Sequence, residues 1–381
     1  MRRLPLVLIL FTASLPASEP AFSLWDNHES VADYAKRVNL PPTKTLDLGN
    51  GVKLDLVLIP AGKFMMGTPE PTPVHEDAFR TNIIIGQSLL AASVGALTVM
   101  LGVIATQAIR RRQRPKFSLL RLLAITIVAG TAVVSGLHWR QSALGLLQEQ
   151  LEYEAAKARF LYEGLPQFRH RPAHSVTLTE PFYMGKFVVT QAQYQAVTGA
   201  YLGQFTGNSD PAQLISWDDA QDFCKKVSDA TRDVVRLPTE AEWEYACRAG
   251  TNTTYYSGDT EADLARVAWY FRNSHMGPHP VGQKEPNFFG LYDMHGNVSQ
   301  WCLDFMGDYS GSPAIDPQGP DKSEYDDQYR ITRGGAWDDD PKGCRAAAGV
   351  GVNPTIHGRG GDAFGFRVVV VAPKVDFEYI K

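Results

Sequence analysis

Two long apolar runs separated by a cluster of arginines constrain this chain more than any other feature of its sequence. Residues 83–109 are almost entirely apolar, and a second apolar run follows at residues 119–139. A transmembrane helix needs about 20 predominantly apolar residues, and each run is long enough. The segment between them, residues 110–118, contains the run RRRQRPK, and short basic loops stay on the cytoplasmic side of a membrane. We therefore predict a transmembrane hairpin with a cytoplasmic loop and both flanks outside; a buried core hairpin is the alternative.

The N-terminus, residues 1–18, has the pattern of a secretory signal peptide. A basic start precedes a short apolar core, and small residues near Ala17 suit cleavage. The apolar core is too short to span a bilayer by itself, and an uncleaved anchor is the alternative. Export by a signal peptide agrees with the orientation that the basic loop sets for the hairpin. The sequence thus predicts an integral membrane protein whose main domain lies on the outer, periplasmic side.

The composition of the chain is that of a folded, loop-rich protein without a nucleic-acid partner. Hydrophobic residues make up 44% of the 381 residues, and a net charge of −4 gives no field that attracts nucleic acid. The four cysteines lie in the C-terminal half and include no CxxC pair, which excludes a zinc ribbon. In an exported chain an even number of cysteines permits two disulfides, and three pairings stay open. The cysteines are Cys224, Cys247, Cys302 and Cys344.

Apolar periodicity predicts short strands and helices on both sides of the hairpin. Residues 26–38 have a weak helical pattern, and residues 52–59 alternate as a strand does. Beyond the hairpin, we expect strands at residues 174–178, 182–190 and 364–371. These strands are short, and the segments between them are rich in glycine and proline.

Three hydroxyl residues mark the starts of helices after the hairpin. Thr190 precedes a helix over residues 191–197, and Ser216 precedes a second helix. Thr239 lies three residues before Glu242, which is the spacing of a capping box. In such a box, the two side chains satisfy backbone N–H groups that the first helical turn leaves without partners.

A glycine-rich stretch near the C-terminus resembles a known family. The stretch is RGGAWDDDPKGCR at residues 333–345, and GFR follows at residues 365–367. Both resemble the C-terminal signature of the sulfatase-modifying factor family, also called formylglycine-generating enzymes. Further phrases agree with this family in the same order: Met184-Gly185-Lys186, Ser216-Trp217-Asp218, Arg236-Leu237-Pro238-Thr239-Glu240, Pro280-Val281-Gly282, Pro286-Asn287, Gly290-Leu291-Tyr292-Asp293-Met294 and Gly296-Asn297-Val298. The resemblance implies an α+β fold, a loop-rich variant of the C-type lectin fold, here with two inserted transmembrane helices.

The resemblance also implies a copper site in the glycine-rich stretch. In that family, two cysteines five positions apart hold one copper(I) ion, which activates oxygen to convert a sulfatase cysteine to formylglycine. In this chain the second cysteine falls on Cys344, and the first falls on Asp339. Copper(I) is a soft ion that prefers paired thiolates to a carboxylate. The expected catalytic positions are therefore Cys344 and Asp339, with Cys344 as the surviving ligand, and copper(I) is expected only if the oxidase activity survives.

A second metal site is implied at residues 293–300, which resemble the calcium-binding loop of the family. There, an acidic or amide side chain, two backbone carbonyls and a final glutamate bind the ion, and calcium prefers such mixed oxygen ligands. Asp293 keeps the first ligand, and Gly296 and Val298 supply the carbonyl oxygens. Gln300 stands where the family has glutamate, so one negative charge is lost. The resemblance thus implies a calcium site of reduced affinity.

These interpretations give an order of segments and two candidate functions. We expect a membrane-anchored binding or scaffold module with a degenerate copper oxidase site. The alternative is a formylglycine-generating oxidase that acts on a cysteine of an exported, sulfatase-type protein. In both cases the partners are membrane lipid, through the two helices, and an exported protein or sulfatase. The predicted segments are a signal peptide (1–18), the first part of the domain (45–80), two transmembrane helices (83–109 and 119–139) around a basic loop (110–118), a stalk helix (141–165) and the main part of the domain (167–374).

Overall fold

The computed structural model describes residues 22–68, 172–202, 207–323, 328–356 and 364–373. These residues all belong to one compact unit. The predicted signal peptide, the transmembrane hairpin with its basic loop, and the stalk helix lie outside the described residues. Within the described ranges, none of the helices combines the length and the apolar character needed to cross a lipid bilayer.

The helices of the described residues are short, and polar side chains cap their first turns. Thr190, Ser216 and Thr239 each accept a hydrogen bond from the backbone N–H three residues on, and the side chain of that third residue binds back to the backbone of the cap. The three predicted helix starts are therefore confirmed. The helices are α1 (Val31–Arg37), α4 (Gln191–Thr198), α5 (Trp217–Thr231), α6 (Glu240–Arg248) and α7 (Glu261–Val267).

The strands form small sheets that are mostly antiparallel. One sheet has the order β1-β2-β5-β14-β6, a second β10-β4-β3, a third β12-β11-β9-β13, and β7 pairs with β8. Short helices combined with largely antiparallel strands make this an α+β domain. The strands are β1 (Thr43–Asp47), β2 (Lys53–Ile59), β3 (Gly62–Met66), β4 (His174–Leu178), β5 (Phe182–Gly185), β6 (Val235–Arg236), β7 (Ala268–Trp269), β8 (His295–Gly296), β9 (Ser299–Phe305), β10 (Ala314–Ile315), β11 (Arg330–Arg333), β12 (Gly349–Val352), β13 (Phe364–Phe366) and β14 (Val369–Val371).

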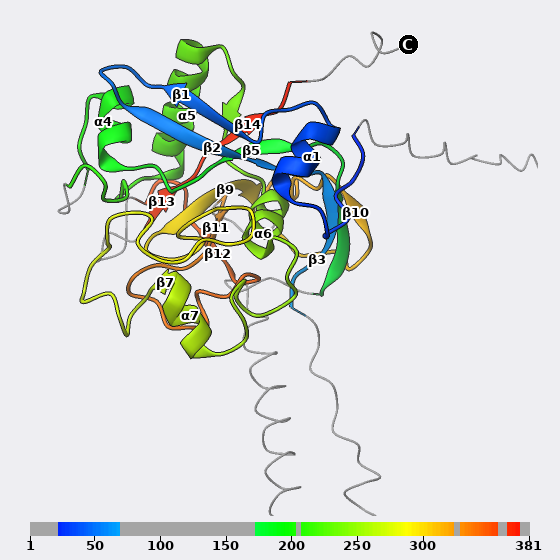
Figure 1. The fold of residues 1–381 in the computed structure, drawn as a ribbon. Coiled ribbons are helices and arrows are strands. Elements are labelled where there is room, and N and C mark those ends of the chain that lie inside the picture. The colour runs from blue at the N-terminus through cyan, green and yellow to red at the C-terminus, as the bar shows by residue number, and fades with distance from the viewer. Residues whose placement is uncertain (1–21, 69–171, 203–206, 324–327, 357–363, 374–381) are drawn as a thin grey trace, which may run out of the picture. The chain divides into compact units, whose positions relative to one another are not determined.

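The strands that precede residue 69 pair with strands that follow residue 171. Leu58 of β2 lies opposite Tyr183 of β5, and Phe64 of β3 lies opposite Val176 of β4, both in antiparallel register. In Figure 1, β2 and β5 run side by side between β1 and β14. Two parts of the chain that are far apart in sequence therefore build a single fold.

The strand expected at residues 364–371 is two strands in different sheets. β13 pairs in parallel with β9, whereas β14 pairs with β5 and β6, and the break falls at the buried Arg367. The strand expected at 182–190 likewise ends at Gly185. Beyond it, the N–H of Val189 donates to the carbonyl of Phe366, so this segment follows the end of β13 and leaves the β2 ladder.

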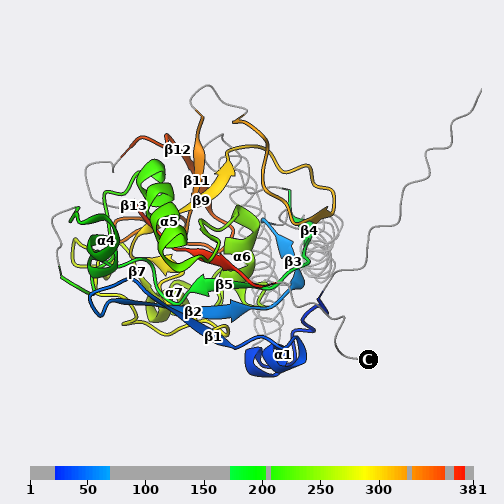
Figure 2. The same cartoon turned by 90° about the horizontal axis from the view of Figure 1, so that it is seen from above.

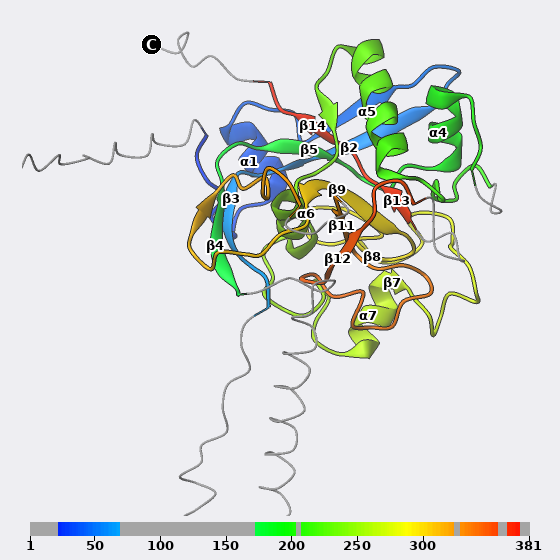
Figure 3. The same cartoon turned by 180° about the vertical axis from the view of Figure 1, so that it is seen from behind.

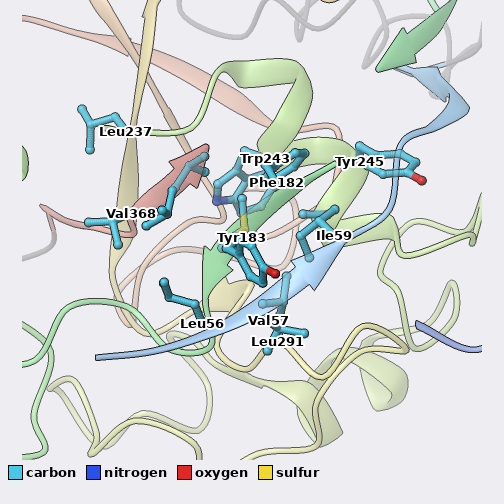
Figure 4. Packing of buried hydrophobic residues seen from close by; sticks show 14 of the residues in the cluster. Leu56, Val57, Ile59, Phe182, Tyr183, Leu237, Trp243, Tyr245, Leu291 and Val368 are labelled. Carbon is cyan, nitrogen blue, oxygen red and sulfur yellow. The ribbon is translucent and has the colours of Figure 1, made fainter. Parts of the chain in front are cut away.

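Helix α6 is buried along its whole length and joins the sheets. It packs against β3, β9 and β11, and it lies between β3 and β9 when the domain is seen from above (Figure 2). Its Trp243 side chain lies beside Phe182 and Ile59 in the core (Figure 4). Strand β7 and helix α7 lie on the side away from β1 and β2 (Figures 1 and 3). The residues of both predicted sites lie on elements or loops around α6 and β7.

Candidate functional site

A tight turn carries the chain past Cys344. Gly335 has φ +68°, and a Cβ atom added there would lie 3.0 Å from the Cys344 Sγ and 2.9 Å from the carbonyl oxygen of Gly343. Only glycine combines this left-handed backbone conformation with such a close approach. Gly335 of the signature is therefore required by the packing around the thiol.

The Cys344 thiol is a buried core group. Its side chain is fully buried, and it packs in a small apolar cluster beside α7 and β7. Burial raises the pKa of the Cys344 thiol well above its usual range, and the carboxyl groups of Asp339 and Asp340 add to this effect. At neutral pH the group is thus a neutral thiol without access to solvent. Its cluster partners are Tyr255, Leu264, Val267, Ala268 and Tyr270.

Asp339 stabilises its own turn. Its Oδ2 accepts a hydrogen bond from the backbone N–H of Ala336 at 2.8 Å, and its carbonyl oxygen accepts one from the N–H of Phe271 at 3.0 Å. Burial raises the pKa of the Asp339 carboxyl to about 6. The neighbouring Asp338 and Asp340 are exposed, so the acidic run forms a surface turn with its middle member half-buried.

The four cysteines are free and buried, so the two disulfides that their even number permits are not formed. Among the described residues, no group of three or more His, Cys, Asp or Glu side chains is placed to hold a metal ion. A single thiol beside a carboxylate that is bound to its own turn does not fit copper(I), which prefers a pair of soft thiolate ligands. Cys344 and Asp339 are neighbours, but they lack the chemistry of a copper site.

His295 links the Cys344 segment to the core, a role that the sequence did not indicate. Its Nδ1 lies 2.7 Å from the carbonyl oxygen of Cys344, and since a carbonyl only accepts, Nδ1 carries the proton. Its Nε2 then accepts from the N–H of Tyr256 at 3.1 Å, with the Cys247 Sγ at 3.8 Å. Burial lowers the pKa of His295 to about 3, so the ring is neutral. The neutral His295 ring beside the neutral, buried Cys247 thiol is a structural contact and does not activate a nucleophile.

Arg333, the first residue of the signature, joins the Cys344 segment to α6. Its Nε donates to Oε1 of Glu240 at 3.0 Å, and its Nη2 donates to Oε2 of Glu244 at 3.0 Å. Its Nη1 donates to the carbonyl oxygen of Ala346 at 3.0 Å. The guanidinium is fully buried and each group named here is hydrogen-bonded, so Arg333 has a structural role. We call such buried, hydrogen-bonded residues that join parts of the domain its frame. This role of Arg333 was not predicted from the sequence, and the spacing of Glu240 and Glu244 on one helix face is the signal that points to it.

The residues predicted to bind calcium lie in the segment that leads through β8 into the start of β9. The Asp293 carboxyl is buried, and its Oδ2 accepts from the N–H of Gly282 at 2.8 Å while its Oδ1 lies 3.4 Å from Nδ2 of Asn297. Gly296 is in β8 with φ +67°, and the fully buried Val298 follows it. The structure thus brings the predicted residues into one loop whose side-chain oxygens accept from N–H groups.

Gln300 departs from the predicted ligand set. Its Oε1 accepts hydrogen bonds from Nε1 of Trp243 at 2.8 Å and from Nε of Arg367 at 3.2 Å. Its Nε2 donates to the carbonyl oxygen of Asp293 at 2.8 Å. The single side-chain oxygen of Gln300 is therefore already bound by two donors, and the side chain as it lies does not fit a calcium ligand. Calcium at the remaining positions stays a prediction.

Comparison with known proteins identifies the domain. The profile of the sulfatase-modifying factor enzyme 1-like domain matches residues 146–372, more than half of the chain. The chaperone protein LppX of Paenibacillus barcinonensis is 30% identical over 215 residues, which cover 43% of this chain and 71% of LppX. The formylglycine-generating enzyme of Streptomyces coelicolor is 34% identical over 141 residues, covering 33% of this chain and 42% of that enzyme. The match therefore spans less than half of the enzyme.

Solved structures show the same fold. Treponema denticola variable protein 1 superposes with a TM-score of 0.56 at 22% identity, covering 87% of this chain and all of that one. PvdO from Pseudomonas aeruginosa gives 0.54 at 21% identity, with 87% and 99% covered. Likeness at this identity concerns the fold alone. From the profile match and the similarity to LppX, the chain belongs to the sulfatase-modifying factor family.

Proposed function

We propose that this domain is a binding module for an exported polypeptide and that it does not oxidise cysteine. The observation that carries the proposal is the Cys344 thiol, which is buried, neutral and paired with Asp339 in place of a second cysteine. A polypeptide as the partner is supported by the relative LppX, whose name describes a chaperone. The surface turn at Asp338 and Asp340 adds exposed negative charge close to the family's reaction site.

We further propose that the module is anchored in a membrane by residues 83–109 and 119–139, with the described domain on the outer side. The apolar length of these two segments, the basic loop between them and the signal-like N-terminus support this arrangement. The full-length chain should then stay in the membrane fraction at alkaline pH and enter solution only with detergent. Release by alkali alone would contradict the anchor.

A second candidate is the oxidase itself, because relatives named formylglycine-generating enzymes match the domain and Cys344 keeps one of the two thiols. When bound, copper(I) would supply oxygen activation, and Cys344 is the residue of this chain left to hold it. The carboxylate at Asp339 is a hard ligand, which is why we place this candidate second.

One experiment separates the two candidates. The full-length chain in detergent is loaded with copper(I) and mixed with a sulfatase-type cysteine peptide under oxygen, and mass spectrometry follows the peptide. We expect no conversion and no stoichiometric copper. Conversion that disappears in Cys344→Ser would establish the oxidase and overturn our proposal.

A gain-of-binding variant sharpens the same test. Asp339→Cys restores two cysteines five positions apart and should take up about one copper(I) per chain. Asp340→Cys, which adds a thiol one residue closer to Cys344, is the matched control and should take up less. Equal copper uptake by the unaltered chain and Asp339→Cys would show that Asp339 is not what removes the site.

The binding function needs a positive readout as well. A reduced, denatured exported protein such as lysozyme is diluted into buffer with or without the full-length chain, and light scattering reports its aggregation. Suppression at a near-equimolar ratio would support a polypeptide-binding module. Aggregation that the chain does not change would count against the chaperone-like form of the proposal.

A further inference from the structure

The loop at residues 293–300 is held by hydrogen bonds at the point where a calcium ion would be expected to hold it. We propose that Gln300 and Arg367 replace the cation, so that this segment folds without calcium and adds no calcium response to the stability of the domain. The proposal concerns the frame of the domain and is independent of whether Cys344 is catalytic.

The first support is the direction of the Gln300 amide. Its Nε2 donates to the carbonyl oxygen of Asp293, so a backbone oxygen of the loop is bound by an N–H group. A cation and an N–H group both bind to oxygen lone pairs, so each can hold a carbonyl in place. The Oε1 atom meanwhile faces two donors, Trp243 and Arg367. Gln300 thus ties the loop to α6 and to the segment between β13 and β14.

The second support is the positive charge of Arg367. This residue is fully buried, and its Nη2 donates to the carbonyl oxygen of Tyr292 at 2.6 Å while its Nη1 donates to the carbonyl oxygen of Gly185. A guanidinium group stays protonated at neutral pH even when it is buried. Arg367 therefore supplies a fixed positive charge beside the loop and binds the carbonyl next to Asp293.

A glutamate at position 300 would reverse this arrangement. Its carboxylate can still accept from Trp243 and Arg367, but it has no N–H to donate. One carboxylate oxygen would face the carbonyl oxygen of Asp293, close to the buried Asp293 carboxyl, and oxygen atoms facing each other repel unless a cation lies between them. Glutamate would thus create the need for a cation that glutamine removes.

The test compares how calcium changes the melting temperature of three proteins. Full-length wild type, Gln300→Glu and Gln193→Glu are each unfolded by heat in 5 mM CaCl2 and in EDTA. Gln193→Glu is the matched control because it makes the same chemical change at an exposed capping box, where it also removes an N–H donor to a backbone carbonyl, that of Lys53. We expect Gln300→Glu to melt roughly 2–10 °C lower than wild type in EDTA and to recover part of that loss in calcium.

The difference between the calcium shifts decides the question, since any site elsewhere contributes equally to all three proteins. A larger calcium shift in Gln300→Glu than in the other two supports the proposal. Equal shifts, or a larger shift in wild type, overturn it. If Gln300→Glu does not fold in either buffer, Asp293→Asn in the wild-type background decides: a calcium shift unchanged from wild type supports the proposal, and a lost shift overturns it.

Discussion

The resemblance implies that Asp339 and Gln300 both differ from the family's residue at the same position, and the structure accommodates the two side chains in different ways. The Gln300 side chain hydrogen-bonds to two remote parts of the domain through its oxygen and to the carbonyl of the nearby Asp293 through its nitrogen. The Asp339 side chain accepts one bond inside its own turn. A change that finds partners across the core becomes part of the frame, whereas a change at the surface turn alters the chemistry beside Cys344. The comparison teaches that the fold and the reaction site can change separately.

We expect the largest loss of stability from a change at Arg333, because this residue connects the Cys344 segment to α6. Helix α6 also carries Trp243, which donates a hydrogen bond to Gln300. Arg333→Met leaves the carboxylates of Glu240 and Glu244 buried without it, and we expect a loss of about 3–5 kcal/mol in the free energy of unfolding. Denaturant unfolding of the full-length chain measures it. Lys225→Met removes an exposed ion pair on α5 and should leave the free energy of unfolding unchanged. Similar losses in the two variants would mean that the buried cluster of Arg333, Glu240 and Glu244 does not stabilise the fold more than an exposed ion pair does.

Gln300→Ala should follow, since it removes the partner of three buried groups at once. The indole N–H of Trp243, the Nε–H of Arg367 and the carbonyl of Asp293 lose their hydrogen bonds, and a small cavity remains. We expect a loss of about 2–3 kcal/mol. Gln193→Ala, which breaks a half-exposed capping box, should lose about 1 kcal/mol or less. A larger loss in Gln193→Ala than in Gln300→Ala would show that the hydrogen bonds of Gln300 do not make a major contribution to stability.

The sequence predicted the local parts of this frame and missed the remote ones. Thr190, Ser216 and Thr239 were readable as caps because a cap and its partner lie three residues apart. The partners of Gln300 are 57 and 67 residues away, and no local pattern encodes such pairs. The resemblance grouped Gln300 with Asp293, which the structure places beside it, but assigned the Gln300 oxygen to a metal.

The same limit applies around the thiol. The spacing between Asp339 and Cys344 was visible in the sequence, and the loss of the copper pair followed from it. The burial of Cys344 by α7 and the bond from His295 to its carbonyl oxygen depend on tertiary packing. The break of the last strand at Arg367 was missed because the apolar pattern continues through residues 364–371 while the hydrogen-bonding partners change.

Asp339→Asn should change the free energy of unfolding by a smaller amount, and the change should depend on pH. The pKa of Asp339 is raised in the folded chain from 3.8 to about 6 by burial, so the wild type loses stability as the pH rises from about 4 to about 6. Asparagine does not titrate and can still accept from Ala336. The variant should gain about 1–2 kcal/mol relative to wild type across that interval and stay level above it. Urea unfolding at pH 4, 5, 6 and 7.5 measures the difference, and a gain that appears only above pH 7 would contradict the assignment.

The smallest effect on stability is expected at the residue that resembles a catalytic one. Cys344→Ala removes a single buried sulfur from an apolar cluster, and we expect a loss of about 1 kcal/mol. The more decisive measurement is alkylation, because iodoacetamide reacts with the thiolate of an accessible cysteine. In native wild type at pH 8, mass spectrometry should find Cys344 unmodified, and full labelling should appear only in denaturant. A binding module can have an inaccessible thiol at this position, whereas an oxidase needs a thiol that can bind the metal and contact the substrate. Rapid labelling of native Cys344 would therefore move this residue from the core back to the reaction site, and the contrast with Gln300 would disappear.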